Sequence, residues 1–168
     1  MKLSSELLKH AKMLVKLRGN GPEQVNLRRA ISAAYYALFH AVCEVFAESV
    51  VGDGKELKRA WLQTYRSLNH KTVCNRLMDI HDFLKSDKKE KQSKQLNFPK
   101  SVKDIAYVFS TLKGKREEAD YNPLSEKLNP MHAALQIVSA EKAINELQKL
   151  DDKHKTALAA FIGISNNR

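Results

Sequence analysis

The 168-residue chain has few of the residues that define several protein classes. Its only cysteines are Cys43 and Cys74, and they do not form a CxxC pair. A disulfide framework is therefore not expected, and we predict two buried thiols in a reducing cytosol.

No uninterrupted apolar run approaches the roughly 20 residues of a membrane span. Lysines also interrupt the N-terminal apolar residues, which argues against a signal peptide. We expect a cytoplasmic protein that has no membrane partner.

Familiar catalytic motifs are also missing from the sequence. It contains neither GxxxxGK[ST] nor GxGxxG, so an ordinary nucleotide-hydrolysing enzyme is not expected. There is no HExxH motif, and the six histidines are scattered singly, none of them four residues from another. A zinc site is therefore not expected, and nothing in the sequence indicates a bound cofactor.

Positive charge is in excess and unevenly placed. The chain has 29 Lys/Arg against 19 Asp/Glu, a formal net charge of +10. Residues 1–115 carry 22 Lys/Arg against 11 Asp/Glu, whereas residues 116–168 carry 7 against 8. This excess favours a polyanionic or acidic partner. A Lys-rich solubilising surface explains it equally well.

Proline and glycine punctuate a chain that otherwise reads as helical. No segment alternates with period 2 over the length of a strand, so we expect an all-α fold. Proline costs about 3 kcal/mol inside a helix and so marks helix ends. The expected fold is an up-and-down bundle of four to five helices over residues 1–152, with an extension at 153–168 that packs on the bundle or on a partner. The expected helices cover residues 4–18, 23–50, 55–85 with a break near 67–69, a fourth that begins at 99 and runs into the stretch at 115–123, 129–150 and a short 156–162.

The stretch RRAISAAYYALFHAV, residues 28–42, carries polar and aromatic side chains on more than one helix face. Tyr35 and Phe39 are spaced to pack inward, while Tyr36 and His40 form an i, i+4 pair. A partly buried tyrosine hydroxyl or imidazole needs hydrogen-bond partners. These groups are therefore either satisfied at the edge of the core or part of a site.

A second stretch, KREEADYNP, occupies residues 115–123. On a continuous helix Arg116 and Asp120 are i, i+4 neighbours, a pair worth about 0.3–0.5 kcal/mol when exposed. Tyr121 follows, and Pro123 prevents the helix from continuing normally. Alone, this pattern is typical of a salt bridge at a helix end.

Together the two stretches resemble the HEPN family, small all-α domains of prokaryotic toxin–antitoxin, defence and nucleotidyltransferase-partner systems. The matching order is SAAYYALFHA, a helix containing NHKTV, then REEADY, then the amphipathic HAALQIVSAEKAINEL. The resemblance is to the branch with a YYAxFHA helix and an RxxADY motif, and it covers roughly residues 5–150. It implies a helical bundle that usually forms a homodimer.

The resemblance also implies a kind of chemistry. Many members are metal-independent endoribonucleases with an R-x(4–6)-H motif, whose Arg contacts the scissile phosphate and whose His helps proton transfer. Arg116 matches the Arg, but Tyr121 stands where the His is expected. A tyrosine with a pKa near 10 is a poor general base at neutral pH, although it can still donate a hydrogen bond. The implied catalytic candidates are Arg116, Asp120 and Tyr121.

Other side chains complete the predicted site. Tyr36, His40 and His70 are candidates for contacting RNA from neighbouring helices. The run SDKKEKQSKQLN is predicted to be a loop, and Lys88, Lys89 and Lys91 within it could hold a nucleic-acid backbone through a salt-sensitive contact. A solvated loop without a ligand explains the same lysines.

Three hypotheses follow. The first is a HEPN-like protein of a toxin–antitoxin or defence module that binds RNA or a nucleotide near Arg116, with metal-independent ribonuclease activity as its stronger form. The second is a non-catalytic subunit that docks a small nucleotidyltransferase, in which the motif is a structural clamp or Tyr121 is a modification target. The third is a plain nucleic-acid-binding bundle. Residues 151–168 carry no predicted function.

Overall fold

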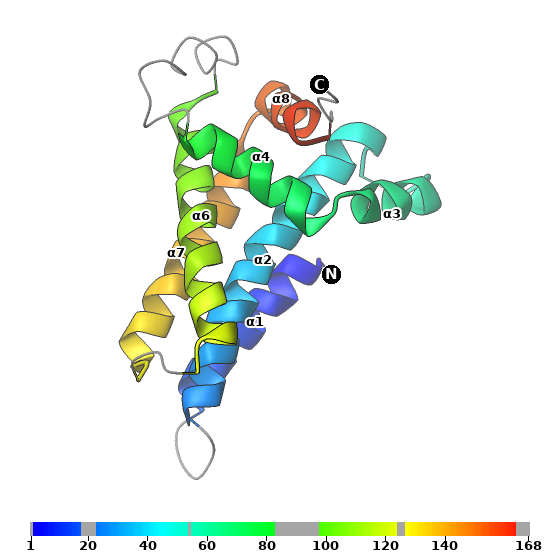
Figure 1. Ribbon diagram of the computed structural model, residues 1–168. Coiled ribbons are helices and arrows are strands. Elements are labelled where there is room, and N and C mark those ends of the chain that lie inside the picture. The colour runs from blue at the N-terminus through cyan, green and yellow to red at the C-terminus, as the bar shows by residue number, and fades with distance from the viewer. Residues whose placement is uncertain (1, 18–22, 54, 83–97, 124–126, 164–168) are drawn as a thin grey trace.

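The computed structural model describes residues 2–17, 23–53, 55–82, 98–123 and 127–163. These residues form seven α-helices and, within the described ranges, no strand (Figure 1). The predicted all-α class is therefore confirmed. The helices are α1 (Leu3–Lys16), α2 (Glu23–Val51), α3 (Lys58–Ser67), α4 (His70–Asp82), α6 (Lys100–Tyr121), α7 (Pro130–Lys149) and α8 (Asp152–Gly163).

The long helix α2 is central and packs against α1, α3, α6, α7 and α8 (Figure 1). Its buried residues lie on all sides of the helix, as in a core helix. Many of them are alanines, which let neighbouring helices approach closely. Among the described helices, α2 is the one long and apolar enough to cross a membrane, although its apolar residues do not form an uninterrupted run. However, 89% of its apolar 18-residue window is buried inside the bundle.

Helices α6 and α7 lie beside α2 and run antiparallel to each other (Figure 1). Pro99 takes the N-cap position of α6, while Asn129 caps α7 by accepting a hydrogen bond from the backbone N–H of His132 at 2.8 Å. Pro130 follows as the first residue of α7, where a missing N–H costs nothing. Because α6 continues to Tyr121, the stretch REEADY lies on one helix, which meets the condition on which the i, i+4 spacing of Arg116 and Asp120 depends.

The predicted break in the third helical region is confirmed. Helix α3 ends at Ser67 and α4 begins at His70. Asn69, between them, accepts a hydrogen bond from the backbone N–H of Thr72 at 2.8 Å, which satisfies a donor that helix geometry leaves unpaired. In Figure 1, α3 projects to one side, whereas α4 crosses close to α6.

The C-terminal helix α8 packs against α2 and α4, and places Leu158 and Ile162 in the main core. Its predicted start at residue 156 was wrong by four residues. Asp151 accepts a hydrogen bond from the backbone N–H of His154 at 2.8 Å and so begins the helix at Asp152. The prediction had followed the apolar residues instead of this cap.

Helix α1 is joined to α2 by a buried polar contact. Glu44 of α2 is only 3% exposed. It accepts hydrogen bonds from the backbone N–H of Ser4 at 3.1 Å and from the Ser4 hydroxyl at 2.7 Å. A carboxylate is favoured at the start of a helix because N–H groups there have no partner within the helix. The contact fixes α1 along α2, where α1 forms one wall of the site.

Candidate anion-binding site

A cleft of about 850 Å³ lies between α1, α2 and α6. Leucines of α1, together with Val25 and Ala33 of α2, make its apolar part. Its ionisable side chains include three guanidinium groups and one carboxylate, so its lining is positively charged. The polar residues lining it are His10, Arg28, Arg29, Ser32, Tyr36, Arg116, Asp120 and Tyr121.

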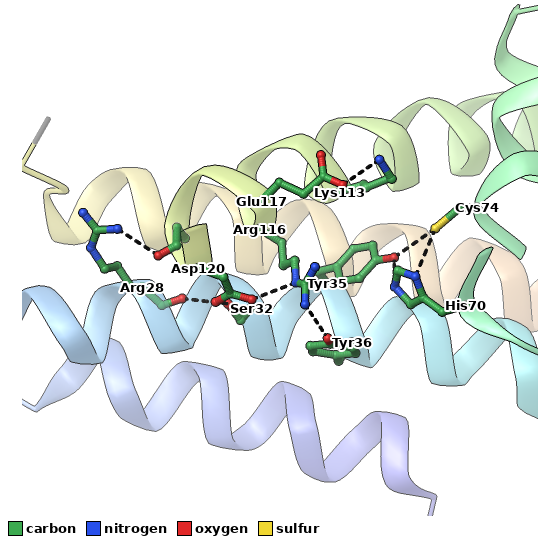
Figure 2. A network of polar contacts seen from close by, with 11 residues as sticks. Arg28, Ser32, Tyr35, Tyr36, His70, Cys74, Lys113, Arg116, Glu117 and Asp120 are labelled. Carbon is green, nitrogen blue, oxygen red and sulfur yellow. Dashed lines mark hydrogen bonds and ion pairs between the residues drawn. The ribbon is translucent and has the colours of Figure 1, made fainter. Parts of the chain in front are cut away.

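Arg116 is held at several points (Figure 2). Its Nε lies 2.7 Å from Oδ2 of Asp120, an ion pair whose angle falls outside hydrogen-bond geometry. Its Nη2 donates a hydrogen bond to the hydroxyl of Tyr36 at 2.7 Å. Its guanidinium carbon lies 5.4 Å from the centre of the Tyr36 ring and 5.0 Å from that of Tyr121, within the range of cation–π attraction. The predicted i, i+4 pair therefore exists, and it is more enclosed than an ordinary surface pair.

The side chains of Arg116 and Asp120 are 14% and 17% exposed. Burial alone lowers the pKa of Arg116, but attraction to Tyr36, Asp120 and Tyr121 outweighs burial and raises it. The positive charge is thus permanent. Because Arg carries a planar fork of donors, a guanidinium fixed in this way is suited to an anion with several oxygens.

Asp120 is itself fixed by α2. Its Oδ1 accepts a hydrogen bond from the hydroxyl of Ser32 at 2.5 Å, and that hydroxyl lies 3.2 Å from the backbone oxygen of Arg28. Ser32 is 5% exposed, so this contact belongs to the packed interface between α2 and α6. The carboxylate therefore links the two helices and also sets the position of Arg116.

Arg28 closes the end of α6. Its Nη1 donates hydrogen bonds to the backbone oxygens of Ala119 at 2.8 Å and Asn122 at 2.9 Å. Ala119 lies in the last turn of α6 and Asn122 is its C-cap, so these carbonyls lie where partners within the helix run out and a cation is favoured. Arg28 therefore supports the end of the helix that carries Asp120 and Tyr121.

Four polar residues that line the cleft, His10, Arg28, Arg29 and Ser32, were not among the predicted site residues. Arg28, Arg29 and Ser32 belong to the stretch at residues 28–42 whose polar side chains were expected on more than one helix face, but none of the three was assigned to the site. His10 was treated as a scattered histidine, yet α1 brings this exposed side chain to the same cleft as Arg116. No sequence spacing could have joined His10 to Arg116, because their proximity depends on how α1 packs against α2.

His70 belongs to a second polar cluster, beside the first (Figure 2). Its Nε2 lies 2.5 Å from the hydroxyl of Tyr35, which lies 3.3 Å from Sγ of Cys74. Its Nδ1 lies 3.6 Å from the same sulfur. His70 and Cys74 stand four residues apart, a spacing that could have signalled this contact. The His70 ring is 6.2 Å from the Tyr36 ring, but His70 is not among the residues that line the cleft.

The ionisation of this second cluster follows from its surroundings. Burial, with further contributions from Arg116 and Lys113, lowers the pKa of His70 and favours the neutral imidazole. Burial and the contact with Cys74 raise the pKa of Tyr35, and burial raises the pKa of Cys74. The thiol is thus kept protonated, and Cys43 and Cys74 are both buried and free, as predicted.

His40 lies in a third group, away from the cleft lining. Its Nδ1 is 2.5 Å from the hydroxyl of Tyr65 on α3, and the two rings stack with centres 5.9 Å apart. Burial lowers the pKa of His40. The structure therefore does not bring His40 to Arg116 and uses it between α2 and α3. Lys88, Lys89 and Lys91 fall outside the described residues.

Within the described residues, no group of three or more His, Cys, Asp or Glu side chains could hold a metal ion. Comparison with known proteins gives no match to any protein-family model, curated protein or solved structure. The case for a function therefore depends on the geometry of the cleft and on the resemblance in sequence.

Proposed function

We propose that this chain is a HEPN-like protein of a toxin–antitoxin or defence module that binds the phosphate groups of RNA or a nucleotide in the cleft. The observation that carries the proposal is Arg116, a guanidinium fixed by Asp120 and Tyr36 on the wall of a cleft that Arg28 and Arg29 also line. A cation held in place before binding loses little conformational freedom when a phosphate arrives.

Metal-independent ribonuclease activity is the stronger form of this proposal. Cleavage by the ribose 2′-hydroxyl needs fixed cations to stabilise the phosphorane, and Arg116 is suited to that role. It also needs a group to move a proton. His10 is an imidazole in the lining of the same cleft, whereas His70 is not among the lining residues, although its ring centre lies 6.2 Å from that of Tyr36. We therefore assign His10, with Arg116, to the first round of substitutions.

The proposal is tested by RNA binding, measured as fluorescence anisotropy at several salt concentrations. Arg116→Ala should weaken binding about tenfold or more, which corresponds to roughly 1.4 kcal/mol. Arg116→Lys should restore only part of the loss because an ammonium lacks the planar fork. Lys115→Ala is the matched control, since Lys115 is adjacent, exposed and paired with Glu118 on the same helix.

Equal binding by wild type, Arg116→Ala and Lys115→Ala would contradict the proposal and favour a plain basic surface. Cleavage is followed separately, in EDTA, on the same RNA. Loss of cleavage in Arg116→Ala and in His10→Ala would support the ribonuclease form, provided that both variants are folded and that His10→Ala still binds RNA.

A second candidate function has its own observation. Tyr121 is 68% exposed beside Arg116, so its hydroxyl is open to another enzyme and lies near a group that attracts phosphate. We propose, as the alternative, that the chain docks a small nucleotidyltransferase and that Tyr121 receives the nucleotide. The tyrosine oxygen would attack the α-phosphorus of a nucleoside triphosphate, lose its proton to a base of the partner enzyme and release pyrophosphate.

This alternative predicts a neighbouring reading frame with a GS-x(10)-DxD pattern. Co-expression with that protein should add the mass of one nucleotide, detected by intact-mass measurement. Tyr121→Phe should remove the adduct, whereas Tyr107→Phe should retain it, because Tyr107 is similarly exposed at 58% on the same helix but away from the arginines. An unmodified wild-type chain would reject the modification and leave docking alone.

A further inference from the structure

Three aromatic rings form a stacked column between α2 and α3. The Tyr65 ring lies nearly parallel to the His40 ring, at an interplanar angle of 14° and with ring centres 5.9 Å apart. It also lies nearly parallel to the Trp61 ring, at an angle of 16° and with centres 5.2 Å apart. We call His40, Tyr65 and Trp61 the aromatic column. All three side chains are partly exposed, so the column reaches the surface of the molecule.

Trp61 is the ring of the column that the core uses least. None of the ten residues of α3 is buried, and the helix projects to one side of the bundle (Figure 1). Tyr65 packs against the core and its hydroxyl contacts His40 of α2, whereas Trp61 belongs to neither hydrophobic cluster. The indole Nε1 of Trp61 has no hydrogen-bond partner among the described residues, so no hydrogen bond ties this large ring to the fold.

Positive charge accompanies the aromatic column. Residues 57–78 contain five Lys/Arg and no Asp/Glu, which is half of the net charge of +10 within a short part of the chain. Three of these cations, Lys58, Arg59 and Arg66, are exposed on α3, and none of them forms an ion pair with another described residue. Lys58 stands one turn before Trp61, while Arg59 and Arg66 share a side of the helix because they are seven residues apart. The helix therefore offers cations beside a ring.

We infer that the aromatic column and these three cations bind single-stranded RNA, with a base stacked on Trp61 and the backbone phosphates held by Lys58, Arg59 and Arg66. Unpaired bases stack on aromatic side chains, while a positively charged surface holds the backbone without regard to sequence. The bases of duplex RNA are stacked on one another and do not offer their faces. The inference rests on the proposed function, because it takes RNA as the ligand and adds a second contact for it outside the cleft.

Helix α2 joins the aromatic column to the cleft. Tyr36 lines the cleft, and His40 stands one turn later on the same helix, about 6 Å further along the helix axis. A strand with a phosphate at Arg116 therefore meets the column when it continues past Tyr36 toward α3. A single nucleotide is expected to occupy the cleft alone, whereas a longer strand occupies both contacts.

The fluorescence of the protein tests this contact directly. Trp61 is the only tryptophan in the chain, so intrinsic fluorescence reports on this position without a label. Single-stranded RNA of about 16 nucleotides, the upper end of the usual site sizes, should quench it over the concentrations at which anisotropy detects binding. Duplex RNA of the same length should leave the fluorescence nearly unchanged, as should a single nucleotide.

Substitution of the ring gives a second readout. Trp61→Ala should weaken binding of the single-stranded RNA about fivefold or more, the usual effect of losing one stacked base. Tyr107→Ala is the matched control, because it removes an exposed ring from α6 and should leave binding unchanged. Circular dichroism should confirm that both variants are folded.

The charges are tested by salt dependence. Arg59→Ala/Arg66→Ala should reduce by about 1.4 the slope of log affinity against log salt, since each phosphate contact with a single strand contributes about 0.7. Lys100→Ala/Lys142→Ala removes the same charge from two exposed lysines that line a groove between α6 and α7, and should leave the slope unchanged.

The outcomes separate this inference from the proposed function. RNA binding without a change in Trp61 fluorescence would overturn the inference and leave the cleft as the contact, as would equal affinities of wild type and Trp61→Ala. Quenching that persists at the same RNA concentrations in Arg116→Ala would support the aromatic column and contradict the role of the cleft. A wild-type chain that binds no single-stranded RNA would overturn both.

Discussion

Tyr35 and Tyr36 are neighbours on α2, and their rings touch with centres 5.4 Å apart, yet they serve different polar networks. Tyr35 is fully buried and its hydroxyl meets His70 and Cys74. Tyr36 is partly exposed, and its hydroxyl accepts a hydrogen bond from Arg116 at the edge of the cleft. One step along the helix therefore separates a closed network from an open one.

The two networks differ in whether a ligand can reach their polar groups. In the closed network, the buried Tyr35 and Cys74 and the half-buried His70 satisfy one another between α2 and α4, which is how polar groups removed from water avoid the cost of lost hydration. In the open network, a permanent cation is held by α2 and α6 but still lines a cleft. The first arrangement supports the fold, whereas the second presents a fixed charge to a ligand.

The largest expected effect is on the closed network. Tyr35→Ala removes a fully buried ring that packs edge-on against Phe109, and should lower the free energy of unfolding by about 3–5 kcal/mol. Tyr35→Phe keeps the ring but removes the partner of His70, and should cost about 1–3 kcal/mol. Chemical denaturation measures both. Tyr36→Ala should cost clearly less, and equal losses at the two positions would remove the distinction drawn above.

The next effect concerns two ion pairs with the same spacing on α6. Asp120→Ala leaves Arg116 without its carboxylate in a partly buried setting, and should lower the free energy of unfolding by about 1–3 kcal/mol. Glu117→Ala breaks the more exposed pair with Lys113 and should cost about 0.5 kcal/mol or less. The comparison is made by urea denaturation at moderate salt. Similar costs would mean that the enclosure of Arg116 adds nothing to stability.

A pH effect tests His70 of the closed network together with His40, which lies between α2 and α3. The pKa of His70 is lowered by burial and by Arg116 and Lys113, and the pKa of His40 is lowered by burial. Protonation therefore favours the unfolded chain, whose histidines titrate near pH 6.5. The stability due to the neutral imidazoles is fully present above that pH and is lost as pH falls through the lower folded-state pKa.

The measurement is the urea midpoint between pH 7.5 and 5.5, above the range where carboxylates titrate. We expect the midpoint to fall with pH in the wild type and to fall less in His40→Gln/His70→Gln. Arg116→Ala should also reduce the fall, because it removes a positive charge that disfavours protonation of His70. A double variant with an unchanged pH profile would show that other groups control the dependence.

Much of the fold could be predicted because the sequence places strong local signals at helix ends. Asn129–Pro130 gave the start of α7, and Pro99 gave the start of α6. The break between α3 and α4 was visible near Asn69. The start of α8 was predicted four residues late, because the cap at Asp151 precedes its first buried residue by several positions. Capping residues therefore locate the start of a helix more closely than the first apolar residue does.

The site was less predictable because its contacts join distant parts of the chain. The pair Arg116–Asp120 follows from spacing on one helix. The contacts of Ser32 with Asp120 and of Tyr36 with Arg116 span 88 and 80 residues, so they depend on how α2 and α6 pack. His40 and Tyr36 share a helix spacing that suggested a common role, but the packing of α3 gives His40 a different partner.

The smallest expected effect is also the most selective test of the open network. Tyr36→Phe keeps the ring beside Arg116 and removes only the hydroxyl that accepts its hydrogen bond. The group left behind lies at an open cleft where water can replace the lost partner, so the free energy of unfolding should change by about 0.5 kcal/mol or less, below the usual net value of a hydrogen bond. RNA binding should weaken about two- to fivefold because the guanidinium has gained freedom that binding must remove. Anisotropy and denaturation on the same sample measure the two quantities, with Tyr107→Phe as the control. If Tyr36→Phe lowered stability as much as Tyr35→Phe while leaving binding unchanged, the hydroxyl of Tyr36 would belong to the fold and not to the site.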